Sequence, residues 1–507
     1  MSLAILYSRA QTGIDAPLVT VEVHLANGLP SLSIVGLPEL AVRESKDRVR
    51  GALLNSKFEF PARRITINLA PADLPKEGGR FDLPIALGIL AASGQLPQEA
   101  VHNHEFLGEL ALSGELRPLK GVLPAALACK QAARVLLLPE ANLEEALLVS
   151  DLECYATNHL LGVCAHLNGT TPLSRAAATH ETLPAPEHPD LKDVLGQPQA
   201  RRALEVCAAG SHSLLYIGPP GTGKSMLAAR LPGILPPMTE QEALESAAIR
   251  SVANTTTRTL NHWRQRPFRA PHHTASAVSL VGGGSHPKPG EVSLAHQGVL
   301  FLDELPEFDR RVLEVLREPL ENGHITISRA TQQADYPARF QLIAAMNPCP
   351  CGHLGDGSDR CQCTLEQVRR YRSRISGPLL DRIDLHVEVP RQPIRLSAPK
   401  QAAPEEDSQR VRHRVVAARE RQLHRQGKTN QALAGDEIER FIPLDGHASS
   451  LLQRAIDQLG LSLRAYHRII KVARTIADLE GRETVDPRHV SEAIGYRRLD
   501  RNPHGTV

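Results

Sequence analysis

Residues 218–225, GPPGTGKS, form a glycine-rich stretch between the apolar run LLYI at 214–217 and the helix-like run MLAAR at 226–230. Glycines let successive backbone N–H groups turn toward one anion, and the following helix presents its positive N-terminus to it. The lysine neutralises phosphate oxygens and the final serine ligates Mg²⁺. The alternative interpretation is an ordinary Gly/Pro turn before a helix. Such a turn would not require the lysine and the serine that complete the stretch. The stretch predicts a nucleotide-binding loop that holds ATP and Mg²⁺ through Gly218, Pro219, Pro220, Gly221, Thr222, Gly223, Lys224 and Ser225.

The length of 507 residues exceeds what one hydrophobic core supports, and about 150 residues per domain predicts roughly three domains. Hydrophobic residues make up 42% and charged residues 22%, as in ordinary globular proteins. A net charge of +2 means that any contact with nucleic acid must use a local basic surface. There is no basic start followed by an apolar segment and no run of 18 apolar residues, so we expect a cytoplasmic protein without membrane contact.

The order of patterns along the chain predicts four segments. Residues 1–170 mix β-rich runs (19–24, 64–68) with helical ones (84–92), which indicates an α+β domain. Residues 171–189 are a proline-containing linker. Residues 190–392 alternate apolar strands (214–217, 299–302, 341–345) with helices, typical of a parallel sheet covered on both faces. Residues 393–507 are a second linker and a helical tail, with helices expected at 411–426, 448–459, 464–480 and 487–494.

A second acidic motif follows the glycine-rich stretch by about 80 residues, in GVLFLDE at 298–304. An apolar strand that ends in two acids beside a phosphate loop places Asp303 in the Mg²⁺ shell and lets Glu304 polarise the attacking water. The alternative is a solvated Asp-Glu pair at a strand end, which is common in isolation. The next predicted strand delivers Asn347, a neutral group suited to orienting water or contacting the γ-phosphate.

With these three motifs the sequence resembles an AAA+ ATPase, that is, an α/β P-loop domain with a parallel sheet and a helical lid. The resemblance makes Asn347 the sensor 1 residue, Arg382 in LDRID an arginine finger and Arg464 in SLRA the sensor 2 residue. For each arginine a surface salt bridge is the alternative. Because a finger reaches the nucleotide of a neighbouring subunit, the resemblance implies a ring.

Two longer stretches narrow the resemblance. RPFRAPHHTAS at 266–276 and SGPLLDRID at 376–384 are similar to signature segments of Mg-chelatase-like AAA+ proteins, and the N-terminal region resembles the ComM/YifB family. This resemblance covers nearly the whole chain. It implies a homo-hexameric ATP-driven helicase or translocase that acts on single-stranded and branched DNA and promotes branch migration during recombination in natural transformation. Recombination proteins are then further candidate partners.

The N-terminal region is similar to the C-terminal domain of Lon proteases (ribosomal S5 domain 2-like fold) in PKEGGRFDLP at 75–84 and GELALSGELRP at 108–118. Region 80–82 occupies the serine position of the Lon dyad, and Leu123 occupies the lysine position. A nucleophile needs a hydroxyl with a base in reach, so we expect the fold without peptidase activity. DNA binding, ring stabilisation and partner docking all stay open for this domain.

Two predicted hairpins, at 279–290 and 324–336, are candidates to line the centre of a ring. Their tips carry His286 and Lys288 in the first and Arg329 in the second. One basic residue per tip becomes six in a hexamer, which suits contact with phosphates rather than base stacking, since aromatic residues are only 3% of the chain. A structural arm packed on the core is the alternative for each hairpin.

Four of the eight cysteines, Cys349, Cys351, Cys361 and Cys363, lie in two C-x-C pairs around a Gly/Asp loop. Four thiolates close a tetrahedral Zn²⁺ shell, and a short polar loop gains stability from such a metal. Free or redox-active thiols, and His353 in place of one cysteine, are the alternatives.

Two other functions compete with a DNA motor. One is the ATPase subunit of a chelatase-like metal-insertion complex, for which the chain lacks a D-x-S-x-S docking motif. The other is an AAA+ protein-remodelling factor.

Overall fold

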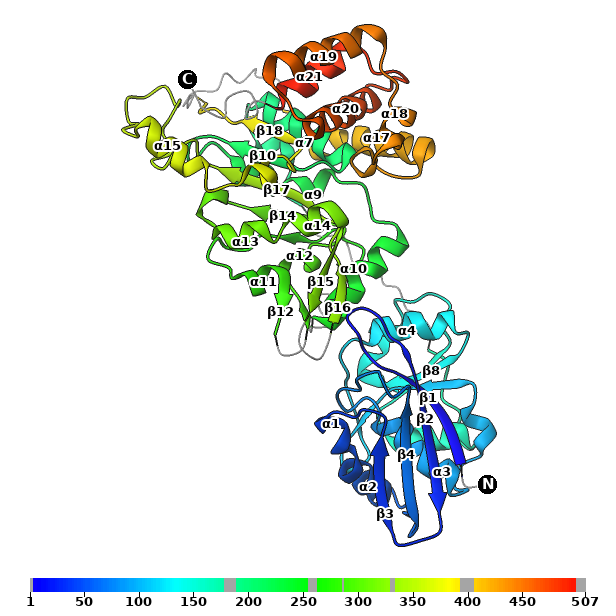
Figure 1. Ribbon diagram of the computed structural model, residues 1–507. Coiled ribbons are helices and arrows are strands. Elements are labelled where there is room, and N and C mark those ends of the chain that lie inside the picture. Colours follow the sequence, from blue (N-terminus) through cyan, green and yellow to red (C-terminus); the bar gives the residue numbers. More distant parts are fainter. Residues whose placement is uncertain are drawn as a thin grey trace. The chain divides into compact units, whose positions relative to one another are not determined.

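The computed structural model describes residues 3–176, 188–253, 262–284, 287–328, 333–392 and 405–497 (Figure 1). They group into two units, each with its own hydrophobic core. The first unit comprises the described parts of Met1–Pro184, Leu244–Trp263 and Ser328–Tyr336. The second comprises those of Ala185–Ala243, Arg264–Ile327 and Pro337–Val507. Helix α10 (Glu240–Val252) therefore contributes residues to both units.

A seven-stranded mixed sheet in the order β3-β4-β2-β1-β5-β8-β9 forms the first unit. Its strands are β1 (Leu3–Arg9), β2 (Leu18–Ala26), β3 (Ser31–Val35), β4 (Arg64–Ala70), β5 (His104–Phe106), β8 (Val135–Pro139) and β9 (Cys154–Thr157). Strand β2 pairs antiparallel with β1 and β4, whereas β5, β8 and β9 run parallel to one another. The strands expected at 19–24 and 64–68 lie within β2 and β4.

Besides its part of α10, the first unit has helices α1 (Leu40–Arg43), α2 (Ser45–Asn55), α3 (Asp82–Ala92), α4 (Val122–Gln131), α5 (Leu143–Ala146) and α6 (Leu160–Leu167). It also has a small hairpin of β6 (Glu109–Leu110) and β7 (Leu116–Arg117). Helix α3, which contains the expected helix at 84–92, packs on β1 and β2 and is buried along nearly its whole length. Buried residues alternate along β2, as expected for a strand with one face against such a helix.

A five-stranded parallel sheet forms the centre of the second unit, in the order β11-β14-β17-β10-β18. The strands are β11 (Phe268–Arg269), β14 (Val299–Leu302), β17 (Gln341–Met346), β10 (Leu214–Ile217) and β18 (Leu385–Glu388). Every residue of β10, β14 and β17 is buried, because helices cover both faces. The predicted parallel sheet is therefore confirmed, and β10 and β14 have the predicted bounds.

Short helices accompany this sheet: α7 (Pro198–Gly210), α8 (Lys224–Ala228), α9 (Leu231–Ile234), α11 (Ala277–Val281), α12 (Glu291–Leu294), α13 (Arg310–Glu314), α14 (Arg317–Asn322), α15 (Leu365–Arg372) and α16 (Gly377–Leu380). Paired strands lie in both expected hairpin regions: β12 (Gly282–Gly283) with β13 (Lys288–Pro289), and β15 (His324–Ser328) with β16 (Gln333–Pro337). The start of the first region was predicted wrongly, because residues 279–281 belong to helix α11.

The C-terminal helices are α17 (Ser408–Gln426), α18 (Asp436–Phe441), α19 (Gly446–Leu459), α20 (Leu463–Leu479) and α21 (Pro487–Gly495). They correspond to the four expected helices, with α18 added. Helices α17 and α20 pack on α7, and one continuous core joins the tail to the parallel sheet. A buried carboxylate reinforces the junction: Asp384, just before β18, pairs with Arg468 of α20. The tail and the sheet thus fold as one unit.

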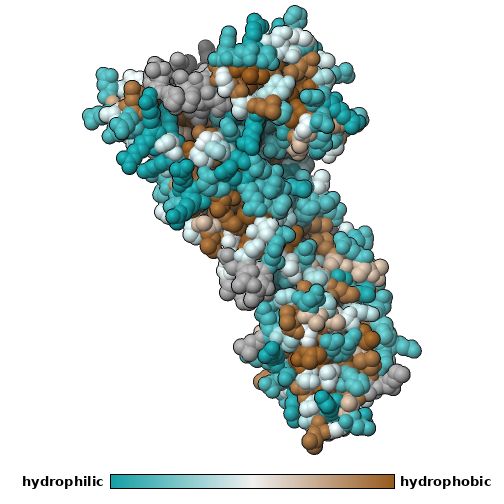
Figure 2. Space-filling view, viewed as in Figure 1, coloured by the Kyte–Doolittle hydropathy of each residue, from teal (hydrophilic) through white to brown (hydrophobic). Residues whose placement is uncertain are grey.

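Hydrophilic side chains cover most of the visible surface of both units, and the apolar ones occur in small scattered groups (Figure 2). None of the helices in the described ranges is both long and apolar enough to cross a membrane. Buried apolar residues are instead concentrated in the two cores.

Candidate nucleotide-binding site

The glycine-rich loop of residues 218–223 leaves the C-terminal end of β10 and leads directly into α8. Strand β10 is flanked by β17 and β18, so the ends of three parallel strands meet at the loop. Two of its glycines are required for different reasons. A Cβ on Gly218 would lie 2.2 Å from the carbonyl oxygen of Val389, whereas Gly223 has a φ of +91° in open space. The first allows a close approach and the second a left-handed turn into the helix.

Lys224 is the first residue of α8, and its ammonium group has three acceptors. Its Nζ donates to the carbonyl oxygens of Gly218 at 2.7 Å and Pro219 at 2.9 Å, and to Oδ1 of Asn347 at 3.2 Å. An ammonium has three donors, so this set satisfies it fully. Burial lowers the pKa of Lys224, and the nearby Asp303 and Glu304 oppose that effect. A phosphate that entered the loop would compete with these neutral acceptors for a positive charge already aimed at the site.

Ser225 and Asp303 face each other across the sheet edge. The Ser225 hydroxyl donates to Oδ2 of Asp303 at 2.6 Å. Ser225 belongs to α8, and Asp303 follows the last residue of β14. A hydroxyl and a carboxylate at this distance are hard oxygen donors of the kind that Mg²⁺ prefers beside phosphates. The residues present therefore fit a Mg²⁺ ion, with Ser225 and Asp303 as the protein groups that would hold it.

Glu304 has a histidine partner that the sequence reasoning did not single out. Its Oε2 lies 3.2 Å from Nδ1 of His273, and its backbone N–H donates to Oδ1 of Asp303 at 2.9 Å. Glu304 has a φ of +52°, an uncommon conformation for a residue other than glycine. His273 packs against His272, with ring centres 4.1 Å apart. The consecutive histidines in the stretch at 266–276 were the available sequence signal for this partner.

The predicted arginines lie away from these contacts. Arg382 is buried: it donates from Nη1 to the Pro378 carbonyl oxygen at 2.6 Å and pairs with Glu321. Its Nε has no hydrogen-bond partner among the described residues. Arg382 and Glu321 both line a surface cavity of about 540 Å³. Arg464 is exposed in the first turn of α20. Within one chain, then, the structure brings together Lys224, Ser225, Asp303, Glu304 and Asn347, and leaves both arginines outside this set.

Comparison with known proteins supports one family for the whole chain. The family models "Magnesium chelatase, subunit ChlI", "Subunit ChlI of Mg-chelatase" and "Magnesium chelatase, subunit ChlI C-terminal" match residues 190–396, 21–142 and 405–497. The Competence protein ComM of Haemophilus influenzae is 53% identical over 505 residues, which is 99% of this chain and 98% of that protein. The uncharacterized protein YifB of Escherichia coli is 51% identical over 501 residues, with the same coverage.

The chain belongs to the ComM/YifB family. Its members are Mg-chelatase-like AAA+ proteins, in agreement with the predicted resemblance. Similarity to the chelatases themselves is more distant: the magnesium-chelatase 38 kDa subunit of Acidiphilium rubrum is 27% identical over 241 residues, or 44% of this chain and 59% of that protein. The ComM/YifB similarity therefore extends over the N-terminal unit as well as the nucleotide site.

The hairpins of this ComM/YifB chain carry the candidate DNA contacts. Lys288 is exposed on β13. His286 and Arg329 lie outside the described residues. A Cβ on Gly282 of β12 would lie 2.3 Å from the Lys288 carbonyl oxygen, so the two strands approach closely beneath the tip. The Lys288 side chain is thus exposed to solvent on a strand that is closely paired with β12.

The residues that the resemblance to Lon proteases singles out have structural partners in this ComM/YifB chain. Arg80 donates to Oε1 of Gln11 at 2.7 Å, and buried Asp82 forms an ion pair with Arg48 at 2.7 Å. Leu123 is fully buried in α4. A guanidinium, an ion-paired carboxylate and a leucine therefore stand where the resemblance would have placed a serine and a lysine.

Proposed function

We propose that this chain is an ATP-hydrolysing, ring-forming translocase or helicase that promotes DNA branch migration in the uptake and recombination of transforming DNA. The observation that carries the ATPase part is the convergence of Lys224, Ser225, Asp303 and Asn347 at one sheet edge. The DNA part rests on near full-length similarity to a protein named for competence.

In this proposal each residue of the nucleotide site has a separate role. Lys224 would exchange its carbonyl acceptors for phosphate oxygens, and Ser225 with Asp303 would hold a Mg²⁺ ion, which would supply positive charge beside the phosphates. Glu304, positioned by His273, accepts a proton from the attacking water. Asn347 links Lys224 to the end of β17, so its side chain senses whether the lysine is bound to phosphate. Each role follows from a contact within the second unit.

Arg382 completes the site of a neighbouring subunit in this proposal. To reach it, Arg382 must exchange Glu321 and the Pro378 carbonyl for the partner's nucleotide. The adjoining cavity gives the Arg382 side chain room to move, and its Nε has no hydrogen bond to lose among the described residues. Arg464 at the start of α20 then contacts the nucleotide from the helical lid. An arginine supplied between subunits makes hydrolysis dependent on ring assembly.

A mixing experiment tests the shared site. Lys224→Ala removes the phosphate contact in its own site, and Arg382→Ala removes the finger for a neighbour. We expect each variant alone to be inactive and a mixture of the two to regain part of the ATPase activity. No recovery upon mixing, with both variants folded, would rule out a shared site.

The domain scheme is part of the same proposal. Residues 1–170 form a Lon-like domain without peptidase activity, 171–189 a linker, 190–392 the AAA+ domain and 393–507 a linker and helical lid. The matched model ranges 190–396 and 405–497 support the last division. DNA engages the hairpins around Lys288, His286 and Arg329 inside a hexamer.

A chelatase-like metal-insertion role is the second candidate, favoured by the three matched chelatase models. The two functions can be distinguished by which molecule stimulates ATP hydrolysis. We expect single-stranded or branched DNA to raise the turnover rate of the purified protein, whereas a tetrapyrrole-binding partner leaves it unchanged. Stimulation only by such a partner would favour the chelatase role, and stimulation by unfolded protein would favour a remodelling factor.

A further inference from the structure

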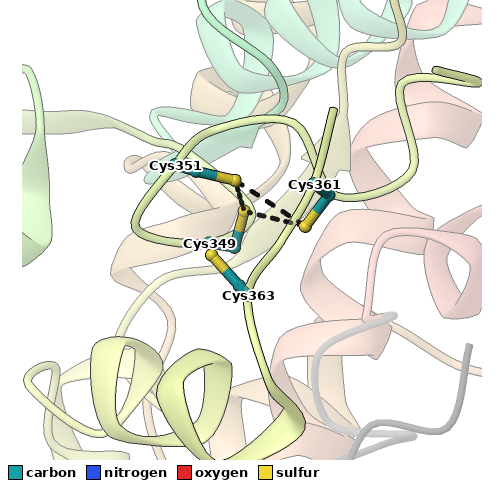
Figure 3. A group of neighbouring side chains, drawn as sticks. All are labelled: Cys349, Cys351, Cys361 and Cys363. Atoms are coloured by element: carbon teal, nitrogen blue, oxygen red, sulfur yellow. Dashed lines mark hydrogen bonds between the residues drawn. The ribbon is translucent and has the colours of Figure 1, made fainter. Parts of the chain in front are cut away.

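The segment of residues 349–363 joins Asn347 to α15 and carries four free cysteines at close quarters (Figure 3). The Sγ atoms of Cys349, Cys351, Cys361 and Cys363 all lie within 4.8 Å of one another. Three of the separations are 3.3 Å, 3.8 Å and 3.7 Å. No other group of three or more His, Cys, Asp or Glu side chains in the described ranges could hold a metal ion.

These distances suit a single tetrahedral metal ion. A Zn–S bond of about 2.3 Å places the sulfurs of a regular tetrahedron about 3.8 Å apart. Sulfurs packed this closely have room for one ion between them and none for an iron–sulfur cluster with its own inorganic atoms. Hydrogen bonds among neutral thiols could bring pairs of cysteines together, but they are weak and give no reason for all four to converge.

The rest of the segment has no hydrophobic core and is held by a few hydrogen bonds, such as those of Asp356 with His353 and Ser358. Most of its residues between 350 and 363 are exposed or half-buried, and Leu354 is the one large apolar side chain among them. The chain reverses at Gly352, with a φ of +82°, and the Gly352 N–H donates to the Cys349 carbonyl at 3.0 Å. A short polar loop with no core gains most of its stability from a metal.

A backbone N–H and a helix N-terminus lie beside two of the sulfurs, and His353 is not among the clustered ligand atoms. The Leu354 backbone N–H donates to Cys349 Sγ at 3.4 Å, a contact that stabilises negative charge on sulfur. Cys363 precedes Thr364, the N-cap of α15, so it lies at the positive end of a helix of eight residues. Nδ1 of His353 lies 3.0 Å from Oδ2 of Asp356, and the ligand atoms that cluster within 4.8 Å of one another are those of the four cysteines alone. The donor set is therefore four cysteines.

We propose that Cys349, Cys351, Cys361 and Cys363 bind one structural Zn²⁺. Four protein ligands leave no open position, so the ion does not act on a substrate. The loop that it fixes lies against the nucleotide site: a Cβ on Gly352 would be 2.8 Å from Cδ of Pro220 and 3.8 Å from Cγ of Asn347. The metal thus keeps one wall of that site in place, whatever the protein does with the nucleotide.

Elemental analysis of the purified full-length protein tests the assignment. We expect about one zinc per chain in the wild type, as for any four-cysteine site. Cys361→Ser should retain less than a tenth of this amount. His353→Ala and Cys164→Ala, the latter changing a buried cysteine of the first unit, should retain all of it. Wild-type protein free of zinc, iron in its place, unchanged zinc in Cys361→Ser, or loss of zinc in His353→Ala would each overturn the proposal.

A measurement on the wild type alone covers the case in which Cys361→Ser does not fold. A mercurial reagent that reacts with thiols is titrated into the folded protein, and released zinc is followed with a metal-sensitive dye. We expect one zinc to be released as four thiols react. Cys351 is exposed and Cys361 and Cys363 are partly exposed, so the reagent reaches the cluster first, whereas all four cysteines outside it are buried. Reaction of the four cluster thiols without release of zinc would contradict the site.

Discussion

The hydroxyl of Ser225 donates a hydrogen bond to Oδ2 of Asp303 at 2.6 Å, although 78 residues separate the two in sequence. Ser225 is fixed by α8, which packs on β17, and Asp303 by the end of β14, a strand of the same parallel sheet. This hydrogen bond therefore forms only when the helix and the strand are correctly placed at the edge of the sheet. It brings together the two protein oxygens that suit a Mg²⁺ ion beside a phosphate.

Replacing Ser225 tests this pair. Ser225→Ala removes a hydroxyl ligand, and we expect the Mg²⁺ concentration needed for half-maximal ATP turnover to rise by about 10–100-fold. Ser225→Thr keeps the hydroxyl and serves as the matched control, with a requirement near that of the wild type. If Ser225→Ala and Ser225→Thr have the same Mg²⁺ requirement, Ser225 is not a metal ligand.

The contact between Glu304 and His273 predicts a change in turnover without a change in binding. Glu304→Gln removes the proton acceptor and should lower kcat by about 10²–10⁴-fold. His273→Ala leaves the carboxylate but removes the group 3.2 Å from it, so the fall in kcat should be smaller. Both variants should bind a fluorescent ATP analogue with wild-type affinity. Loss of affinity in His273→Ala would point to a structural role instead.

Two glycines of the cysteine segment form a matched pair for testing the wall of the nucleotide site. Gly352 and Gly355 have φ of +82° and +75°, so alanine at either position carries a similar backbone cost. Only at Gly352 would the added Cβ meet Pro220, whereas at Gly355 nothing lies within 4 Å. We expect Gly352→Ala to weaken nucleotide binding and Gly355→Ala to leave it unchanged, as measured by calorimetric titration. Equal affinities in the two variants would show that the loop does not support the site.

Stability of the second unit should depend on pH through Lys471 of α20. Burial lowers the pKa of Lys471 to about 8, and its Nζ donates to the Gln431 carbonyl oxygen at 3.0 Å. In an unfolded chain the lysine pKa is about 10.4. Between these values the unfolded state binds more protons than the folded state, so this lysine makes stability rise with pH. Below about pH 8 the full cost of burying its charge is present.

Lys471→Met removes that cost and isolates its pH dependence from that of other groups. At pH 7 we expect the variant to have a free energy of unfolding higher by about 1–3 kcal/mol. This advantage should shrink as pH rises from 8 toward about 10. Urea unfolding of both proteins across this range checks the prediction. An advantage that does not vary with pH would mean that Lys471 titrates normally in the folded state.

The three central strands β10, β14 and β17 could be predicted from the sequence because they are largely apolar runs. The edge strands β11 and β18 were not predicted, since they are short and contain Arg269, His386 and Glu388. β10 and β14 have the predicted bounds, and the meeting of Lys224, Ser225, Asp303 and Asn347 follows from strand polarity once the sheet is parallel. Contacts between loops carry no such periodicity. The pairing of Glu304 with His273 depends on how two loops pack, and that of Arg382 with Glu321 on how a loop packs against the short helix α14, and no sequence spacing encodes either. The choice between His353 and a fourth cysteine also required the fold.

The most direct test of the central claim follows a fluorescently labelled four-way DNA junction incubated with the purified protein, ATP and Mg²⁺. We predict ATP-dependent conversion of the junction to its branch-migrated products by the wild type and none by Lys224→Ala, whose loop lacks the phosphate-binding ammonium. Binding of both proteins to the same junction is measured in parallel, so that a defect in hydrolysis is separated from one in DNA contact. Products that do not require ATP, equal yields from the two proteins, or no products despite ATP turnover would contradict the account.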